Sequence, residues 1–266
     1  MRQFTGNTLA LLIAFGATAA NAATASTAGD LFAKHVEYDG AMLSPTGEYV
    51  LVTTPFEDRR ALTIIKLSGK YDRNIIKFDA PETVDNALWT DDYRIIVEKA
   101  KDYGFFGSLV STGNVYAADA DAGNQTQLFG YLPDHSNFRS RFKDQGNVSF
   151  MRLLPGTKGE ALFYFSPWTQ GNSKSITSVF RVDTHTGARK QVESIPDYAD
   201  IIPDNAGIPR FTMARELDGR QVVRYRRLPS DSGWTPTPAL LAGTSMAIWF
   251  FEADNNHAYA EISDHG

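Results

Sequence analysis

The stretch Val179–Val192, "VFRVDTHTGARKQV", decides the fold because the earlier stretch Val115–Leu128, "VYAADADAGNQTQL", follows the same pattern. In both, a valine and an aromatic residue precede an aspartate, and a glycine follows four residues after that aspartate. Apolar segments on either side of a glycine-containing turn are typical of β-hairpins. Their repetition predicts that one hairpin unit recurs along the chain.

A second kind of hairpin opens each unit, with a turn rich in Pro, Gly, Asp or Asn followed by an alternating apolar strand. "LSPTGEYVLVTT", from Leu43, is the first of these openers. The turn markers are Ser44, Thr90, Pro155, Asp204 and Asp254, spaced by 46, 65, 49 and 50 residues. Four strands in two hairpins every 40–50 residues or so are typical of a β-propeller blade.

The sequence therefore predicts an all-β chain, a β-propeller of four-stranded antiparallel blades with about four complete blades and the first hairpin of a fifth. The competing fold is a β-sandwich, which also uses short strands and frequent turns. A further alternative is that Asp30–Tyr38 completes the last blade of a five-bladed ring. The predicted blades are 36–80, 81–133, 146–196, 199–240 and the partial 245–266.

Two details of these blades bear on function. The 65-residue spacing predicts an insertion in the second blade, Lys99–Asn114, between its second and third strands. This loop holds Phe105 and Phe106, which are candidates for substrate gating or ligand contact, although they could equally pack on each other. Trp168, in "SPWTQGNS", is the third candidate, because it lies in a predicted loop rather than in a strand.

The hairpin turns predict where glycine is needed for its backbone conformation. A left-handed backbone costs glycine nothing, because it has no Cβ. The glycines predicted to adopt positive φ are Gly69, Gly123, Gly187 and Gly233.

The N-terminus resembles a secretory signal. Arg2 precedes the short apolar core Leu9–Phe15, and Ala20–Ala22 has the small-x-small form of a cleavage site. Residues 1–22 are therefore predicted to be a signal peptide and 23–266 the mature, periplasmic or secreted domain. Removing Arg2 takes the net charge from −5 to −6, which gives no electrostatic reason to bind nucleic acid. No later apolar run has the length of a membrane span, and the chain contains no cysteine.

Three motifs suggest chemistry that their context argues against. "GTSMA" around Ser245 is similar to a subtilisin nucleophile segment, but a strand-like "IWFF" follows it and no preceding histidine has the glycine neighbour of that family. Asp134, His135 and Ser136 are adjacent, whereas triads converge from separate loops. "DADAGN" at Asp119 departs from the EF-hand spacing. We therefore predict no catalytic residue, no cofactor and no metal in this chain.

Several phrases resemble the N-terminal propeller of the prolyl oligopeptidase family of serine peptidases, especially its exported bacterial dipeptidyl- or acylaminoacyl-peptidases. They include "LSPTGEYVLV", "TGNVYAADADAGNQTQLFG" and "SVFRVDTHTGARKQVES", and the resemblance covers about residues 30–266. It implies a seven- or eight-bladed propeller followed by an α/β-hydrolase domain that cuts short peptides. No hydrolase domain is present here, so no catalytic residue of the family can be assigned to this chain.

Two functions follow as expectations. The first is a non-catalytic propeller that gates access of short peptides to a hydrolase domain absent from this chain, so that enzyme activity belongs to the parent serine peptidase. The second is a TolB-like periplasmic propeller that binds a protein or a glycan without enzyme activity. Neither the substrate nor the oligomeric state follows from the sequence.

Overall fold

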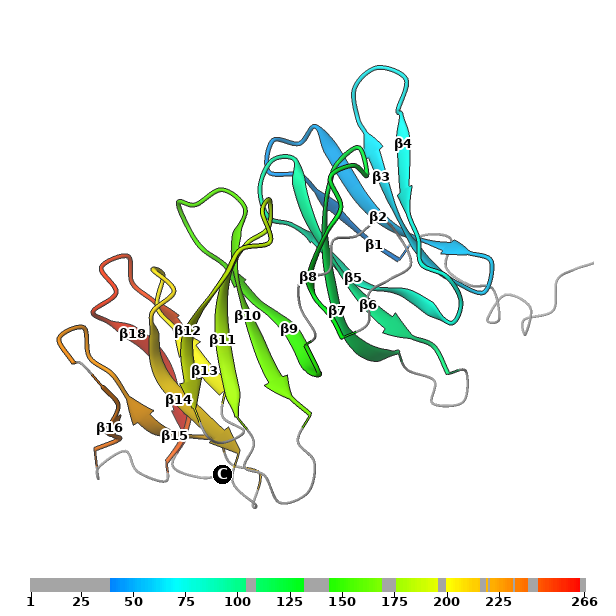
Figure 1. Cartoon of the computed structure of the whole chain (residues 1–266). Helices are drawn as coiled ribbons and strands as arrows, with labels where there is room; N and C mark the ends of the chain where they lie inside the picture. The colour runs from blue at the N-terminus through cyan, green and yellow to red at the C-terminus, as the bar shows by residue number, and fades with distance from the viewer. Residues whose placement is uncertain are drawn as a thin grey trace, which may run out of the picture. The chain divides into compact units, whose positions relative to one another are not determined.

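The computed structural model describes residues 39–103, 109–131, 144–168, 176–195, 200–215, 219, 221–231, 233–238 and 244–263. Within these ranges all the regular structure is β, in strands β1 to β18 (Figure 1). The predicted signal peptide, 1–22, lies outside the described residues.

The first two sheets are four-stranded antiparallel meanders, in which each strand pairs with its neighbour in the chain. The first contains β1 (Asp39–Leu43), β2 (Tyr49–Phe56), β3 (Arg59–Lys66) and β4 (Arg73–Ile76). The second contains β5 (Glu82–Trp89), β6 (Arg94–Lys101), β7 (Val110–Asp119) and β8 (Thr126–Phe129).

The third sheet repeats this order, and the fourth extends it. The third contains β9 (Gly146–Leu153), β10 (Glu160–Pro167), β11 (Thr177–Asp183) and β12 (Arg189–Ile195). The fourth contains β13 (Asp200–Pro203), β14 (Pro209–Arg215), β15 (Gln221–Arg226), β16 (Thr235–Pro236), β17 (Ser245–Phe251) and β18 (Ala258–Ser263). The prediction of a propeller with four blades and part of a fifth is confirmed.

The last hairpin differs in one detail from the prediction of a separate fifth blade. Strands β17 and β18 join the fourth sheet, because Val222 of β15 pairs with Ser245 of β17. The fourth outer strand, β16, is short and pairs with β15 only at Tyr225 and Arg226. This leaves the other end of the β15 edge available to β17.

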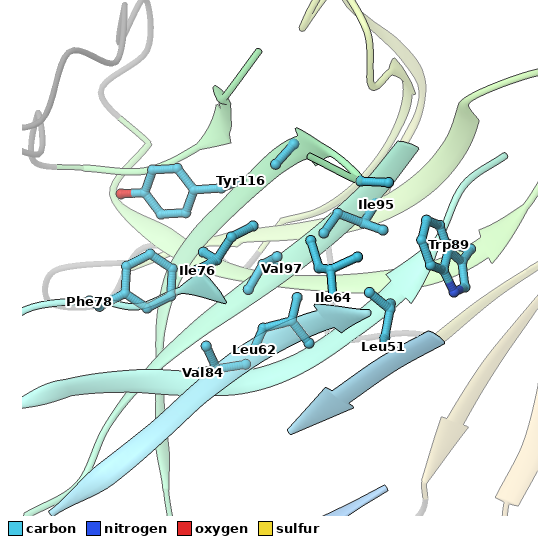
Figure 2. Close-up of a cluster of buried hydrophobic side chains, with 12 residues drawn as sticks. Leu51, Leu62, Ile64, Ile76, Phe78, Val84, Trp89, Ile95, Val97 and Tyr116 are labelled. Atoms are coloured by element: carbon cyan, nitrogen blue, oxygen red, sulfur yellow. The ribbon is translucent and has the colours of Figure 1, made fainter. Parts of the chain in front are cut away.

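Alternating side chains of the strands build apolar layers between consecutive sheets. Leu62 and Ile64 of β3 point to one face of the first sheet, where they meet Val84, Trp89 and other residues of the second sheet (Figure 2). Similar buried clusters join the second sheet to the third, the third to the start of the fourth, and β14–β15 to β17. Each sheet thus uses a neighbouring sheet to cover its apolar face.

The insertion predicted at Lys99–Asn114 is wrong in its bounds. Strand β6 continues to Lys101 and β7 begins at Val110, so both ends of the predicted loop are paired strand. Lys99 is buried, with its Nζ 2.5 Å from Glu82 and 4.8 Å from the ring centroid of Phe78. Because its charge is paired, Lys99 can be buried within β6, although its polar side chain had suggested that the strand ends before it. The long connection of the second unit instead follows β8, between Phe129 and Gly146.

The glycine prediction is half right. Gly69 and Gly187 have φ of 77° and 71°. At the other two positions, Gly123 and Gly233, the backbone is outside the left-handed region. In the hairpin around Gly123 the positive φ falls on its neighbours instead, Ala122 at 63° and Asn124 at 45°.

Candidate binding surface

Trp168 lies directly after β10 and its side chain is 50% exposed. Its indole Nε1 donates a hydrogen bond to Asn147 Oδ1 at 3.1 Å, and its backbone N–H donates to Gln145 O at 2.9 Å. The Tyr131 ring meets the indole edge-on, with centroids 6.4 Å apart. We call Tyr131, Asn147 and Trp168 the aromatic platform. These three residues come from the ends of three different strands.

A partly buried ion pair lies next to the platform. Gly130, next to Tyr131, is bonded twice to Asp144: the Gly130 N–H donates to the side-chain oxygen Asp144 Oδ2 at 3.2 Å, and the Asp144 N–H donates to Gly130 O at 3.0 Å. Arg189 of β12 donates to both oxygens of Asp144, at 2.9 and 3.2 Å. Its guanidinium lies 4.4 Å from the ring centroid of Phe129. The second and third sheets are therefore tied together next to the platform.

The platform has the chemistry of a binding surface. An indole face stacks on apolar side chains or on the C–H face of a sugar, while Asn147 offers hydrogen bonds. Of the predicted contacts, Phe105 and Phe106 lie outside the described residues, and the role of Trp168 as a ligand contact stays a prediction.

Two of the motifs that the sequence context argued against, those of Ser245 and Asp119, have structural roles in the sheets. Ser245 begins β17 and pairs with Val222 and Ser263, which places it in a sheet rather than at the strand-to-helix turn of a nucleophile. Asp119 accepts hydrogen bonds from Arg94 at 2.8 Å and from Asn124 at 2.5 Å. His135 lies outside the described residues.

A polar cluster that the sequence did not reveal joins the second and third sheets. Arg94 of β6 is 1% exposed. Its guanidinium donates to Thr184 O at 2.6 Å, to Asn124 O at 2.8 Å and to Asp119. Alongside it, His185 Nε2 lies 2.6 Å from Asp91 Oδ2. We call Asp91, Arg94, Asp119, Thr184 and His185 the inter-sheet junction.

The junction also alters the acidity of Asp91. Burial raises the pKa of this carboxyl, but the N–H groups of Tyr93 and Arg94 and the His185 ring favour the charged form. The net result is a pKa below the ordinary value of an aspartate. No local sequence pattern could have predicted the contact between Asp91 and His185, since the two residues lie in different repeat units.

One group of possible metal ligands occurs among the described residues. Glu252, Asp254 and His257, in the turn between β17 and β18, place one ligand atom each within 4.8 Å of one another. All three side chains are exposed.

No family model matches the sequence, and no curated protein is similar to it. Several solved structures are similar at low identity. A conserved lipoprotein from Clostridium novyi NT is 11% identical, with a TM-score of 0.33, covering 62% of this chain and 89% of that one. An oligogalacturonate lyase from Vibrio parahaemolyticus is 12% identical, with a TM-score of 0.45, covering 78% and 53%.

A third similar structure, the AtxE2 isopeptidase, is 11% identical, with a TM-score of 0.25, covering 69% of this chain and 44% of that protein. This chain therefore spans about half of the lyase and less than half of the isopeptidase. In the part of the chain that is described, no helix is long and apolar enough to cross a membrane.

Proposed function

We propose that this β-propeller module is the non-catalytic portion of an exported serine peptidase of the prolyl oligopeptidase type, where it limits access of short peptides to a hydrolase domain. The observation that carries the proposal is the succession of antiparallel sheets in chain order, each covering the apolar face of another. The reason for naming a peptidase is the resemblance of the sequence to the propeller of that family.

The opening turn fits the propeller of a peptidase and a TolB-like binding propeller equally, and its residues show how the turn is built. In "LSPTGEY", Ser44 is 4% exposed and its Oγ accepts the Tyr49 N–H at 3.1 Å. Gly47 has a φ of 72°. Serine and glycine therefore have separate structural tasks in the phrase on which the resemblance partly rests.

Sequencing the source DNA beyond the codon for Gly266 tests this proposal. We expect the reading frame to continue through further blades into a G-x-S-x-G motif with a later Asp and His. The 266-residue chain itself should not react with a fluorophosphonate probe. Labelling of the chain at Ser245 would contradict its non-catalytic role, and a stop codon directly after Gly266 would contradict the peptidase assignment.

The aromatic platform favours a second candidate function, a periplasmic module that binds a glycan or a protein. An exposed indole with an adjacent amide is a common arrangement for stacking on a sugar ring. Titrating the chain with oligosaccharides and with short peptides, and measuring binding by calorimetry, distinguishes the two candidates. The matched variants are Trp168→Ala and Trp249→Ala, since Trp249 is also exposed but lies far along the chain in β17.

For the glycan-binding function, oligosaccharide binding should be lost in Trp168→Ala and retained in Trp249→Ala. Oligosaccharide binding that survives in both variants excludes the platform as the binding surface.

A further inference from the structure

We propose that the turn between β17 and β18 is a zinc site formed by Glu252, Asp254 and His257. This inference does not depend on the proposed function. The geometry that leads to it is the convergence of one imidazole and two carboxylates on one point. His257 Nδ1 lies 3.2 Å from Asp254 Oδ2 and 3.5 Å from Glu252 Oε2.

These separations match the edges of a tetrahedral metal site. Ligand atoms about 2.1 Å from a zinc ion lie about 3.4 Å from one another in a tetrahedron. The two distances from His257 Nδ1 are already near that value, and all three ligand atoms lie within 4.8 Å. A small inward movement of the two carboxylates completes a three-ligand face. The fourth position is then open to water.

Outer hydrogen bonds hold both carboxylates in this orientation. Tyr259 Oη donates to Glu252 Oε1 at 2.6 Å, and Asn256 N–H donates to Asp254 Oδ1 at 2.9 Å. In each carboxylate, one oxygen is taken by a protein donor and the other is the oxygen nearest to His257 Nδ1. Metal-binding residues are commonly oriented by outer partners in this way.

A residue from another hairpin fixes the backbone of the turn. Asn205, between β13 and β14, donates its Nδ2 to Glu252 O at 2.8 Å and its backbone N–H to Asn255 Oδ1 at 2.8 Å. The turn is therefore held from outside the ligand set. Such support reduces the entropy that metal binding would otherwise have to overcome.

The donor set selects the metal. One imidazole nitrogen with two carboxylate oxygens suits zinc, whereas calcium and magnesium prefer oxygen ligands alone. The simpler explanation is an ion pair between His257 and the carboxylates. An exposed pair of this kind contributes little to stability, and it predicts no zinc affinity beyond that of the rest of the surface.

Calorimetric titration of the whole chain with Zn²⁺ tests the proposal. We expect one site per chain, and a weakening of at least about tenfold in each of His257→Gln, Asp254→Asn and Glu252→Gln, because each removes a ligand. Tyr259→Phe removes only an outer donor, so it should weaken binding by about tenfold. Circular dichroism of the variants checks that each is folded, which the exposure of the three side chains leads us to expect.

His185→Gln is the matched control, because His185 is also partly exposed and its ring nitrogen Nε2 also contacts a carboxylate, that of Asp91. It should leave zinc binding unchanged. Cobalt in place of zinc should give the visible absorption of a tetrahedral centre, and this absorption should be lost in His257→Gln. Zinc binding that is unaffected by His257→Gln, or calcium binding as tight as zinc binding, overturns the proposal.

Discussion

Arg94 makes a buried polar contact between the second and third sheets. Its guanidinium is buried and satisfies a carbonyl in each sheet, as well as the Asp119 carboxylate. Removing one partner of a buried ion pair leaves the other charge without compensation, which costs about 3–5 kcal/mol. The strand pattern predicts β6, yet nothing in it indicates that the first residue of β6 reaches Thr184.

We expect Arg94→Met to lower the free energy of unfolding by about 3 kcal/mol or more, measured by urea denaturation. The control is Arg181→Met, which removes a partly exposed arginine paired with Glu160 on a neighbouring strand. Its loss should be at most about 1 kcal/mol, since exposed pairs contribute little. Equal losses in the two variants would show that Arg94 does not act through burial.

Asp91 makes the junction sensitive to acid. The pKa of Asp91 is lower in the folded chain than in the unfolded one. The stabilising contribution of this carboxylate to the free energy of unfolding is therefore complete above the unfolded pKa of about 3.9, and it is lost as the pH falls through the folded pKa. Asp91→Asn should therefore be less stable than the unaltered chain at pH 5, with the difference shrinking toward pH 3.

Urea midpoints measured at half-unit intervals between pH 5 and 3 check this prediction. Asp85→Asn is the control, because Asp85 is an exposed carboxylate on β5. An exposed carboxylate contributes little to stability, so Asp85→Asn should differ from the unaltered chain by at most about 1 kcal/mol at pH 5. A constant difference for Asp91→Asn across the interval would contradict the stated effect of the junction.

The turns of the outer hairpins are similar in sequence but differ in backbone conformation. Gly187 has a φ of 71°, and an added Cβ would lie 3.0 Å from Thr126 Cγ2. Gly123, its counterpart in the repeat, lies outside the left-handed region. Glycine in the sequence thus indicated where a turn lies, but not which residue of the turn carries the strained conformation.

Gly187→Ala should lower the free energy of unfolding by about 1–2 kcal/mol, because a side chain in the left-handed region costs about that much. Gly233→Ala is the control, since its backbone is outside that region and an added Cβ would meet no atom within 4 Å. Thermal unfolding of the two variants should show a lower midpoint only for Gly187→Ala. A similar shift in both would mean that backbone conformation is not the cause.

At the scale of the whole molecule, the sequence predicted what depends on local pattern and missed what depends on contacts between units. The alternating apolar strands that follow the openers and the recurring turns predicted the sheets, because strand periodicity and turn chemistry are local. The burial of Lys99 and the pairing of β17 with β15 depend on residues far away in the chain. The aromatic platform also depends on a residue far away in the chain. Trp168 was predicted as a candidate ligand contact, whereas its ring contact with Tyr131 was not predicted.

The same contacts predict that local stability differs along the chain. Ala161, Leu162 and Phe163 of β10 are fully buried, and β10 pairs with strands on both sides. In contrast, β18 pairs only with β17 among the described strands, and its residues from Tyr259 to Ser263 are exposed. Amide hydrogens in β18 should therefore exchange through local opening, and those in β10 only through global unfolding.

Hydrogen exchange measured by NMR or mass spectrometry checks this difference, and two variants locate its cause. Met246 packs on Met213 and Val223, which is one of the contacts that hold β17 against β14 and β15. Met246→Ala should speed exchange in β17 and β18 and leave β10 unchanged, since the cavity weakens only that contact. Phe250→Ala removes an exposed ring of the same strand, stacked on Tyr259, and should have the smaller effect. If β18 exchanges as slowly as β10, or if Met246→Ala speeds exchange in both equally, the last hairpin unfolds together with the rest of the molecule, and its few contacts are stronger than their burial implies.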